Sequence, residues 1–234
     1  MNRIPLVLAA AVVVAAAPRP AHAADDAFGV WNIFSTTGAL GTEDGPGLWR
    51  YWFDAQARYP DVGSGSNQYL ARPALGYQGA NNVSWWVGYA RFRTRSASGA
   101  VADENRYWQQ VSWSTRHRGA QTFALRARLE ERDVENRDET GVVLRLMAKQ
   151  TWPLAGGRSF FLSVEPFFNL RDTDWGGDSG IVQNRLIAGI AWRVSDSLTI
   201  DTGYMHQYVW RTDAEDRNNH VLVLNFKKRL RSGR

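Results

Sequence analysis

From Leu48 onward, apolar and polar residues alternate in segments of 11 to 14 residues, and turn residues separate the segments. In residues 121–132, Phe123, Leu125 and Leu129 share one parity, while Arg126 and Glu130 share the other. A strand places alternate side chains on opposite faces of its sheet, so each segment is predicted to be a strand with one apolar and one charged face. The ten predicted strands are 48–60, 67–78, 83–94, 105–118, 121–132, 141–154, 158–171, 184–194, 198–211 and 219–230.

The length of these segments favours a membrane barrel over a water-soluble sandwich. Strands of soluble domains average five or six residues, whereas a tilted strand needs about 9 to 11 residues to cross a bilayer. After the first 20 residues, no run of 18 apolar residues occurs, so the sequence excludes helical membrane spans. We therefore expect an all-β, closed antiparallel transmembrane barrel of ten to twelve strands.

Aromatic residues are placed mostly toward the ends of the predicted strands. Outer-membrane barrels carry aromatic girdles at such positions, although aromatic residues are also good strand formers in any sheet. The residues concerned are Trp49, Tyr51, Tyr59, Tyr69, Tyr77, Trp113, Trp152, Trp192, Tyr208 and Trp210.

Short and long connections alternate along the chain. The short ones are 79–82, 119–120, 155–157 and 195–197, and the long ones are 61–66, 95–104, 133–140, 172–183 and 212–218. Outer-membrane barrels have short periplasmic turns and longer outer loops, so ten strands would begin and end in the periplasm. Residues 28–40 are also strand-like. They either form a short pair, add an odd strand or lie in the lumen.

The N-terminus reads as a cleaved secretory signal. Arg3 precedes an apolar run of about 14 residues, and Ala21-His22-Ala23 supplies the cleavage pattern. We predict a signal peptide at 1–23, cleaved after Ala23, and a barrel domain at 24–234. Cleavage removes Arg3 and Arg19, so the net charge of +5 falls to +3, which disfavours nucleic acid as a partner. The chain has no cysteine and hence no disulfide or thiolate site.

Several short motifs carry a family resemblance. They are Glu104-Asn-Arg106-Tyr-Trp108-Gln-Gln, Arg126-Ala-Arg128-Leu-Glu130-Glu-Arg132, Asn184-Arg185 before an apolar strand, and Gly203-Tyr-Met-His-Gln207. Together they resemble a family of bacterial outer-membrane β-barrel proteins known only as a domain of unknown function, over about residues 28–230. The resemblance implies the fold and the outer-membrane location but no activity. One departure is the C-terminus, where Phe226 is followed by a basic tail rather than ending the chain.

The polar faces predict an arginine-rich lumen. Its candidate lining residues are Glu104, Arg106, Arg126, Arg128, Glu130, Arg145, Glu165, Arg171, Arg185, Asp201 and Arg211. Small barrels are filled by their own side chains, so a salt-bridged filling is one interpretation. Because arginines outnumber carboxylates in this set, a narrow anion-preferring pore is the other. We expect a passive small-solute channel first, then a non-conducting structural or assembly barrel, and last a lipid-modifying enzyme.

Catalytic and metal motifs are weak. The mature chain has three histidines, and none belongs to a recognisable Ser-His pattern; His206 and His220 are predicted to face lipid. The segment Asp172-Thr-Asp174-Trp-Gly-Gly-Asp178 has alternating oxygens but lacks the glutamate of an EF-hand. We predict no enzyme, catalytic residue, cofactor or metal. The expected partners are outer-membrane lipid, lipopolysaccharide and the barrel-insertion machinery, and the solute stays open.

Overall fold

A computed structural model describes residues 25–40, 48–116, 121–212 and 214–230. Its described residues form strands and connections, which confirms the predicted all-β class. No helix among them is long and apolar enough to cross a membrane. The predicted signal peptide at 1–23 and the predicted turn at 119–120, together with His117, lie outside the described residues.

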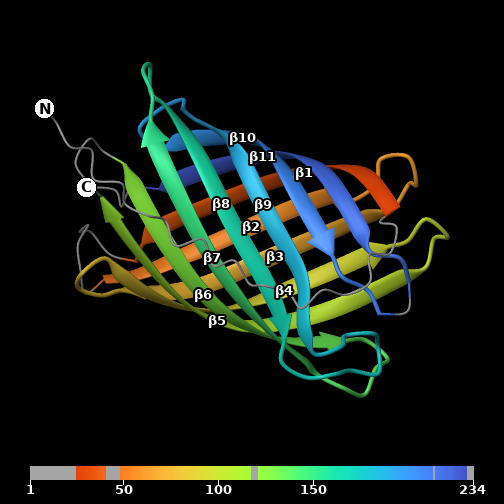
Figure 1. Ribbon diagram of the computed structural model, residues 1–234. Helices are drawn as coiled ribbons and strands as arrows, with labels where there is room; N and C mark the ends of the chain where they lie inside the picture. Colours follow the sequence, from red (N-terminus) through yellow and green to blue (C-terminus); the bar gives the residue numbers. More distant parts are fainter. Residues whose placement is uncertain (1–24, 41–47, 117–120, 213, 231–234) are drawn as a thin grey trace, which may run out of the picture.

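Eleven strands close into one barrel (Figure 1). Each pairs in antiparallel fashion with the next along the chain, and the strands run from 12 residues in β2 to 16 in β5. Their bounds are β1 Asp25–Ala39, β2 Leu48–Tyr59, β3 Asn67–Gln78, β4 Val83–Arg95, β5 Val101–Arg116, β6 Thr122–Val134, β7 Gly141–Pro153, β8 Arg158–Asn169, β9 Gly180–Arg193, β10 Leu198–Val209 and β11 Arg217–Leu230.

The seam between β1 and β11 corrects the expectation of a fully antiparallel barrel. The segment predicted at 28–40 is one full strand, β1, so the strand number is odd. With an odd number, the first and last strands run in the same direction, and β1 pairs with β11 in parallel from Asp25↔Arg217 to Gly38↔Leu230. Eleven lies within the predicted ten to twelve strands, and an odd strand was one of the alternatives for residues 28–40. Only the expectation that the strands begin and end at the same rim is corrected, because β1 begins at one rim and β11 ends at the other.

Alternating burial shows which residues point inward. In β3, Leu70, Arg72 and Ala74 are buried, whereas Tyr69 and Leu75, which flank them, are about half exposed. The strands therefore have an apolar outer face and an inner face that mixes aromatic and charged side chains. This is the period-two pattern read from the sequence, with the facing as predicted.

Among the connections made of described residues, apart from residue 213, those at one end of the barrel are longer than those at the other. The loop end carries the connections 60–66, 96–100, 135–140, 170–179 and 210–216, and the turn end carries those at 79–82, 154–157 and 194–197. The predicted long link at 95–104 is shorter than expected, because β5 already begins at Val101. β1 also begins at the loop end, where Asp25 N donates to Asp216 O at 2.9 Å.

Candidate functional site

Nine of the eleven predicted lumen residues lie on inner strand faces. Arg128, Glu130, Arg145, Glu165 and Asp201 are buried there. Four more have ion-pair or ring partners inside the barrel: Glu104, Arg106, Arg126 and Arg185.

The other two predicted lumen residues lie in loops. β8 ends at Asn169, so Arg171 is exposed in the following connection, and β10 ends at Val209, so Arg211 lies at the mouth of the barrel. Both predictions extended the strand pattern past the point where pairing stops. Arg211 nevertheless lines the cavity described below.

A network of arginines and glutamates crosses the middle of the barrel. Glu130 accepts hydrogen bonds from Arg145 at 2.6 Å and from Arg132 at 2.7 Å, and Arg128 Nη1 lies 3.5 Å from it. Glu165 Oε1 accepts from Arg145 Nη2 at 2.8 Å and from Arg126 at 2.5 Å. Charge-assisted bonds of this kind hold buried charges that would otherwise be costly to desolvate.

Aromatic rings and amides complete this central network. Arg128 donates from Nε and Nη2 to Gln110 Oε1 at 2.9 and 2.6 Å, and its guanidinium lies 4.1 Å from the ring centroid of Trp108. Arg72 pairs with Asp54 at 2.6 Å and lies 5.0 Å from the ring centroid of Trp52. The rings pack where ions alone would leave gaps, so the middle of the lumen is filled.

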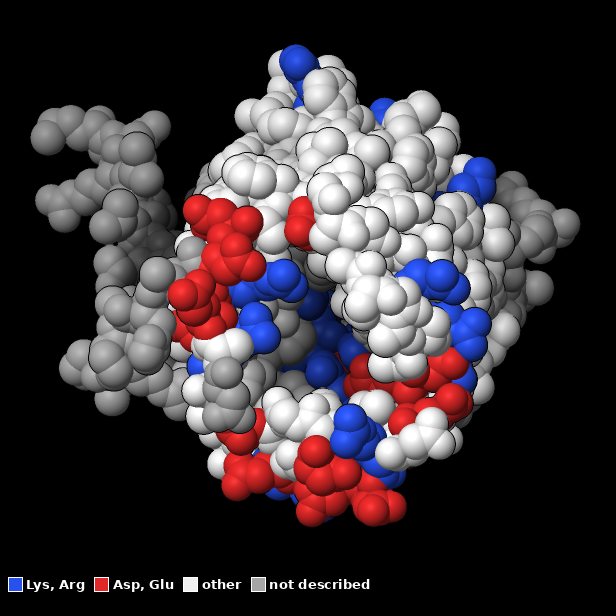
Figure 2. All heavy atoms as spheres, turned by 90° about the vertical axis from the view of Figure 1, so that its right-hand side faces the viewer, with Lys and Arg blue, Asp and Glu red and all other residues white. Residues whose placement is uncertain are grey.

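A cavity of about 720 Å³ opens at the loop end. Figure 2 looks into this end and shows basic side chains in the hollow and acidic side chains around the rim. Asp178 is the single carboxylate residue among its described lining residues. Eight arginines line it: Arg58, Arg72, Arg106, Arg132, Arg145, Arg185, Arg211 and Arg217.

A second cavity, of about 670 Å³, lies at the turn end and is lined by polar side chains that include Arg50, Gln78, Gln110 and Arg126. Arg128 and Glu130 line neither cavity, and each is 1% exposed. The two cavities are thus separated by the central network.

The loops at the mouth are bonded to one another. Trp175, which lines the loop-end cavity, donates from Nε1 to Glu139 O at 2.8 Å, and Asp174 N donates to Glu139 Oε2 at 2.7 Å. Ser179 N donates to Asp172 Oδ1 at 2.6 Å, and this bond lowers the pKa of the Asp172 carboxyl. The acidic segment read as an incomplete calcium loop is therefore a hydrogen-bonded rim.

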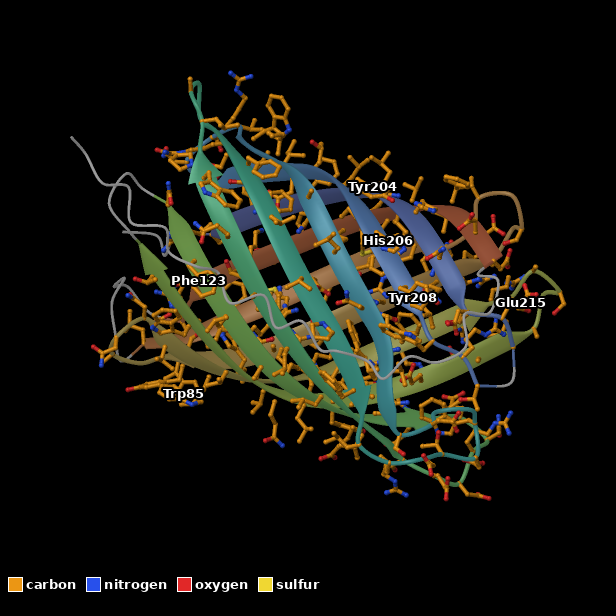
Figure 3. The ribbon with its side chains drawn as sticks, in the orientation of Figure 1. Trp85, Phe123, Tyr204, His206, Tyr208 and Glu215 are labelled. Carbon is orange, nitrogen blue, oxygen red and sulfur yellow. The ribbon has the colours of Figure 1, made fainter. Side chains whose placement is uncertain are left out.

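Two histidines lie on the outer face near the same end, as the alternation predicted. Tyr204 Oη lies 2.6 Å from His220 Nδ1, and His206 Nε2 lies 3.2 Å from Asn218 Oδ1. Figure 3 labels Tyr204, His206 and Tyr208 along β10. Within the described part of the chain, no group of three or more His, Asp or Glu side chains is arranged to hold a metal.

Sequence reasoning missed several inner residues of β1 to β3. Trp31, Asp54, Arg58 and Arg72 are buried inside the barrel. The signal was present in Trp52-x-Asp54-x-Gln56-x-Arg58, where every second residue is polar or aromatic.

The comparisons with known proteins cover most of this barrel. A family model described as "Protein of unknown function (DUF2490)" matches residues 28–219. The chain belongs to this family. It is similar to an uncharacterised protein of Methylorubrum extorquens, with 28% identity over 179 residues, which cover 75% of this chain and 78% of the relative. No solved structure matches the chain.

Proposed function

We propose that this DUF2490 protein is an outer-membrane barrel and a narrow channel for small anions. The loop-end cavity is its entrance, and the central arginine–glutamate network is its constriction. The observation that carries the proposal is the lining of the entrance, which holds eight arginines and one carboxylate residue among its described members.

The outer face supports the membrane location. Leu75, Val87, Leu146 and Leu222 are exposed on strands long enough to cross a bilayer. Aromatic side chains gather near the turn end, where Trp49 contacts Tyr77 and Trp113 contacts Phe123. Figure 3 labels Trp85 and Phe123 at this end, and Tyr208 lies nearer the other. Girdles at the two interfaces are typical of outer-membrane barrels.

The charge arrangement supports anion selectivity. Five of the eight arginines are ion-paired with carboxylates (Arg72, Arg106, Arg132, Arg145 and Arg217), so the excess positive charge comes mainly from the other three, Arg58, Arg185 and Arg211. Low-dielectric walls concentrate the field of this excess charge in the cavity, which raises the local concentration of anions and lowers that of cations. Rings of arginine select anions in pores. Passage then requires the guanidinium groups around Glu130 to exchange their carboxylate partners for the moving ion.

A second function, a non-conducting barrel, is favoured by one observation. The side chains of Arg128 and Glu130 are 0% and 1% exposed, so the constriction is closed at rest. Such a barrel would bind anions in its entrance without passing them.

Planar-bilayer recordings test the proposal. Under a potassium chloride gradient, the reversal potential of the folded protein should indicate chloride preference, and this preference should shrink as salt rises, because the Debye length is about 10 Å at 0.1 M and about 3 Å at 1 M. Replacing Arg217 at the mouth by Glu should move selectivity toward potassium. The matched control is Arg95→Glu, on an exposed residue outside the cavity lining. No unitary conductance from protein with heat-modifiable gel mobility would support the non-conducting barrel instead.

A further inference from the structure

Arg58 is a buried cation whose polar partner is an amide. It is 7% exposed, and its Nε donates to Gln56 Oε1 at 2.8 Å. Its guanidinium carbon lies 4.0 Å from the ring centroid of Trp31 and 5.4 Å from that of Phe92. No carboxylate oxygen of the described residues forms an ion pair with it within 4.0 Å.

Arg185, which also lies against the Trp31 ring, is a partly buried cation of the same kind. Its register partner is Glu165, but Glu165 Oε1 accepts hydrogen bonds from Arg126 and Arg145 instead. With the Gln183 amide oxygen turned toward it, Arg185 donates to that oxygen from Nε at 2.7 Å and from Nη2 at 3.0 Å. Among the described carboxylates, none forms an ion pair with Arg185 within 4.0 Å.

The aromatic rings hold both guanidinium groups in the wall of the loop-end cavity. Arg185 lies 4.8 Å from the ring centroid of Trp31 and 4.5 Å from that of Phe167, so Trp31 contacts both arginines. Stacking fixes a guanidinium plane but leaves the N–H groups at its edge available. Both arginines line the cavity together with Trp31.

We propose that Arg58 and Arg185, placed by Trp31, form a binding site for a small oxyanion, either a carboxylate or a phosphate. The proposal rests on the proposed function, since the ligand is of the class that the entrance would admit. A planar guanidinium edge matches two oxygens of one oxyanion, which a spherical chloride cannot supply. A buried charge without a counter-charge is costly, and a bound oxyanion provides that charge at the point where the protein does not.

The removal of either arginine leaves no carboxylate without its partner. Variants at these positions should therefore fold, in contrast to variants of the central network. Because Arg58→Gln removes an uncompensated buried charge, the melting temperature of this variant without ligand should be equal to or higher than that of the wild type. A site kept for binding at the expense of stability behaves in this way.

Calorimetric titration of the full folded chain in chloride-free detergent buffer tests the site, with inorganic phosphate and succinate as separate probes. We expect the wild type to bind at least one of them, and Arg58→Gln and Arg185→Gln each to weaken that binding at least tenfold. Arg193→Gln, an exposed residue paired with Asp196 in a turn at the opposite end, should bind like the wild type. The probe that binds identifies the oxyanion class. Arg58→Lys keeps the charge but loses the planar edge, and it should also bind more weakly than the wild type.

Three results would overturn the site: no binding of either probe by the wild type at millimolar concentration, undiminished binding by both glutamine variants, or a melting temperature of Arg58→Gln lowered as far as that of a variant in the central network. Conductance is measured separately. Binding without conductance would contradict the channel and leave the site standing, whereas conductance without binding would do the reverse.

Discussion

Glu130 Oε1 lies 2.6 Å from Arg145 Nη1, although these two residues are not register partners in the pairing of β6 with β7. The register pairs Arg128 with Arg145 and Glu130 with Val143. Like charges directly opposite each other destabilise a sheet, and diagonal neighbours are within reach of long side chains. Glu130 therefore offsets a repulsion that the strand pairing itself imposes.

Replacement of Glu130 by Gln should destabilise the barrel strongly. The change leaves Arg128, Arg132 and Arg145 with reduced counter-charge in a buried site, and breaking a buried ion pair costs about 3 to 5 kcal/mol. The measurement is urea unfolding in lipid vesicles. Glu131→Gln is the matched control, because Glu131 is the exposed neighbour on the other face of β6 and should change stability little. Equal stability of the two variants would show that the arginines do not depend on Glu130.

Replacement of Leu146 by Arg should hinder insertion into a bilayer. Leu146 is exposed on the outer face near the middle of β7, where an arginine facing lipid costs about 2 to 4 kcal/mol. Leu170→Arg makes the same change at an exposed residue just beyond β8, in a loop, and should cost little. Vesicle folding titrations compare the two. Similar costs for both would argue that the outer face does not contact lipid.

The strands could be predicted from the sequence because their pattern is local. Period-two alternation in residues 121–132 decides which side chains share a face. In the structure this segment forms most of β6, and Arg126, Arg128 and Glu130 lie on its inner face. The parallel seam could not be predicted, because it depends on the pairing of Asp25 with Arg217, at opposite ends of the chain. No local pattern encodes such a contact.

The site was predictable in composition but not in connectivity. Alternation identified Arg185 and Glu165 as inner residues, and the register even sets them opposite each other. Which arginine receives the carboxylate depends on side-chain reach across β6, β7 and β8, where Arg126 and Arg145 are both bonded to Glu165. Because Arg126 and Arg145 occupy Glu165, Arg185 forms no ion pair with a described carboxylate. Only the three-dimensional arrangement shows this.

The two ends of the barrel should differ in accessibility on intact cells. The native chain has no cysteine, so single cysteines at Ser179, in the loop-end connection after β8, and at Ala155, in the turn after β7, report without background. If the loops face outward, an impermeant maleimide should label Ser179→Cys only, and both variants should react after the cells are lysed. Labelling of Ala155→Cys alone would show the opposite orientation, and equal labelling of both variants on intact cells would contradict the prediction that the two ends differ in accessibility.

The parallel closure can be tested by thiol cross-linking of β1 to β11. Val30 and Leu222 are register partners in this seam. Neighbouring strands lie about 4.8 Å apart, so cysteines at both positions should be joined by a short thiol cross-linker and change the gel mobility of the unfolded chain. The control pair is Val30→Cys with Leu224→Cys, which shifts the second cysteine by two residues along the same face of β11 and should cross-link less efficiently. Preferential cross-linking of the control pair would place the seam in a different register, and no cross-linking of either pair in folded protein would mean that β1 does not close the barrel.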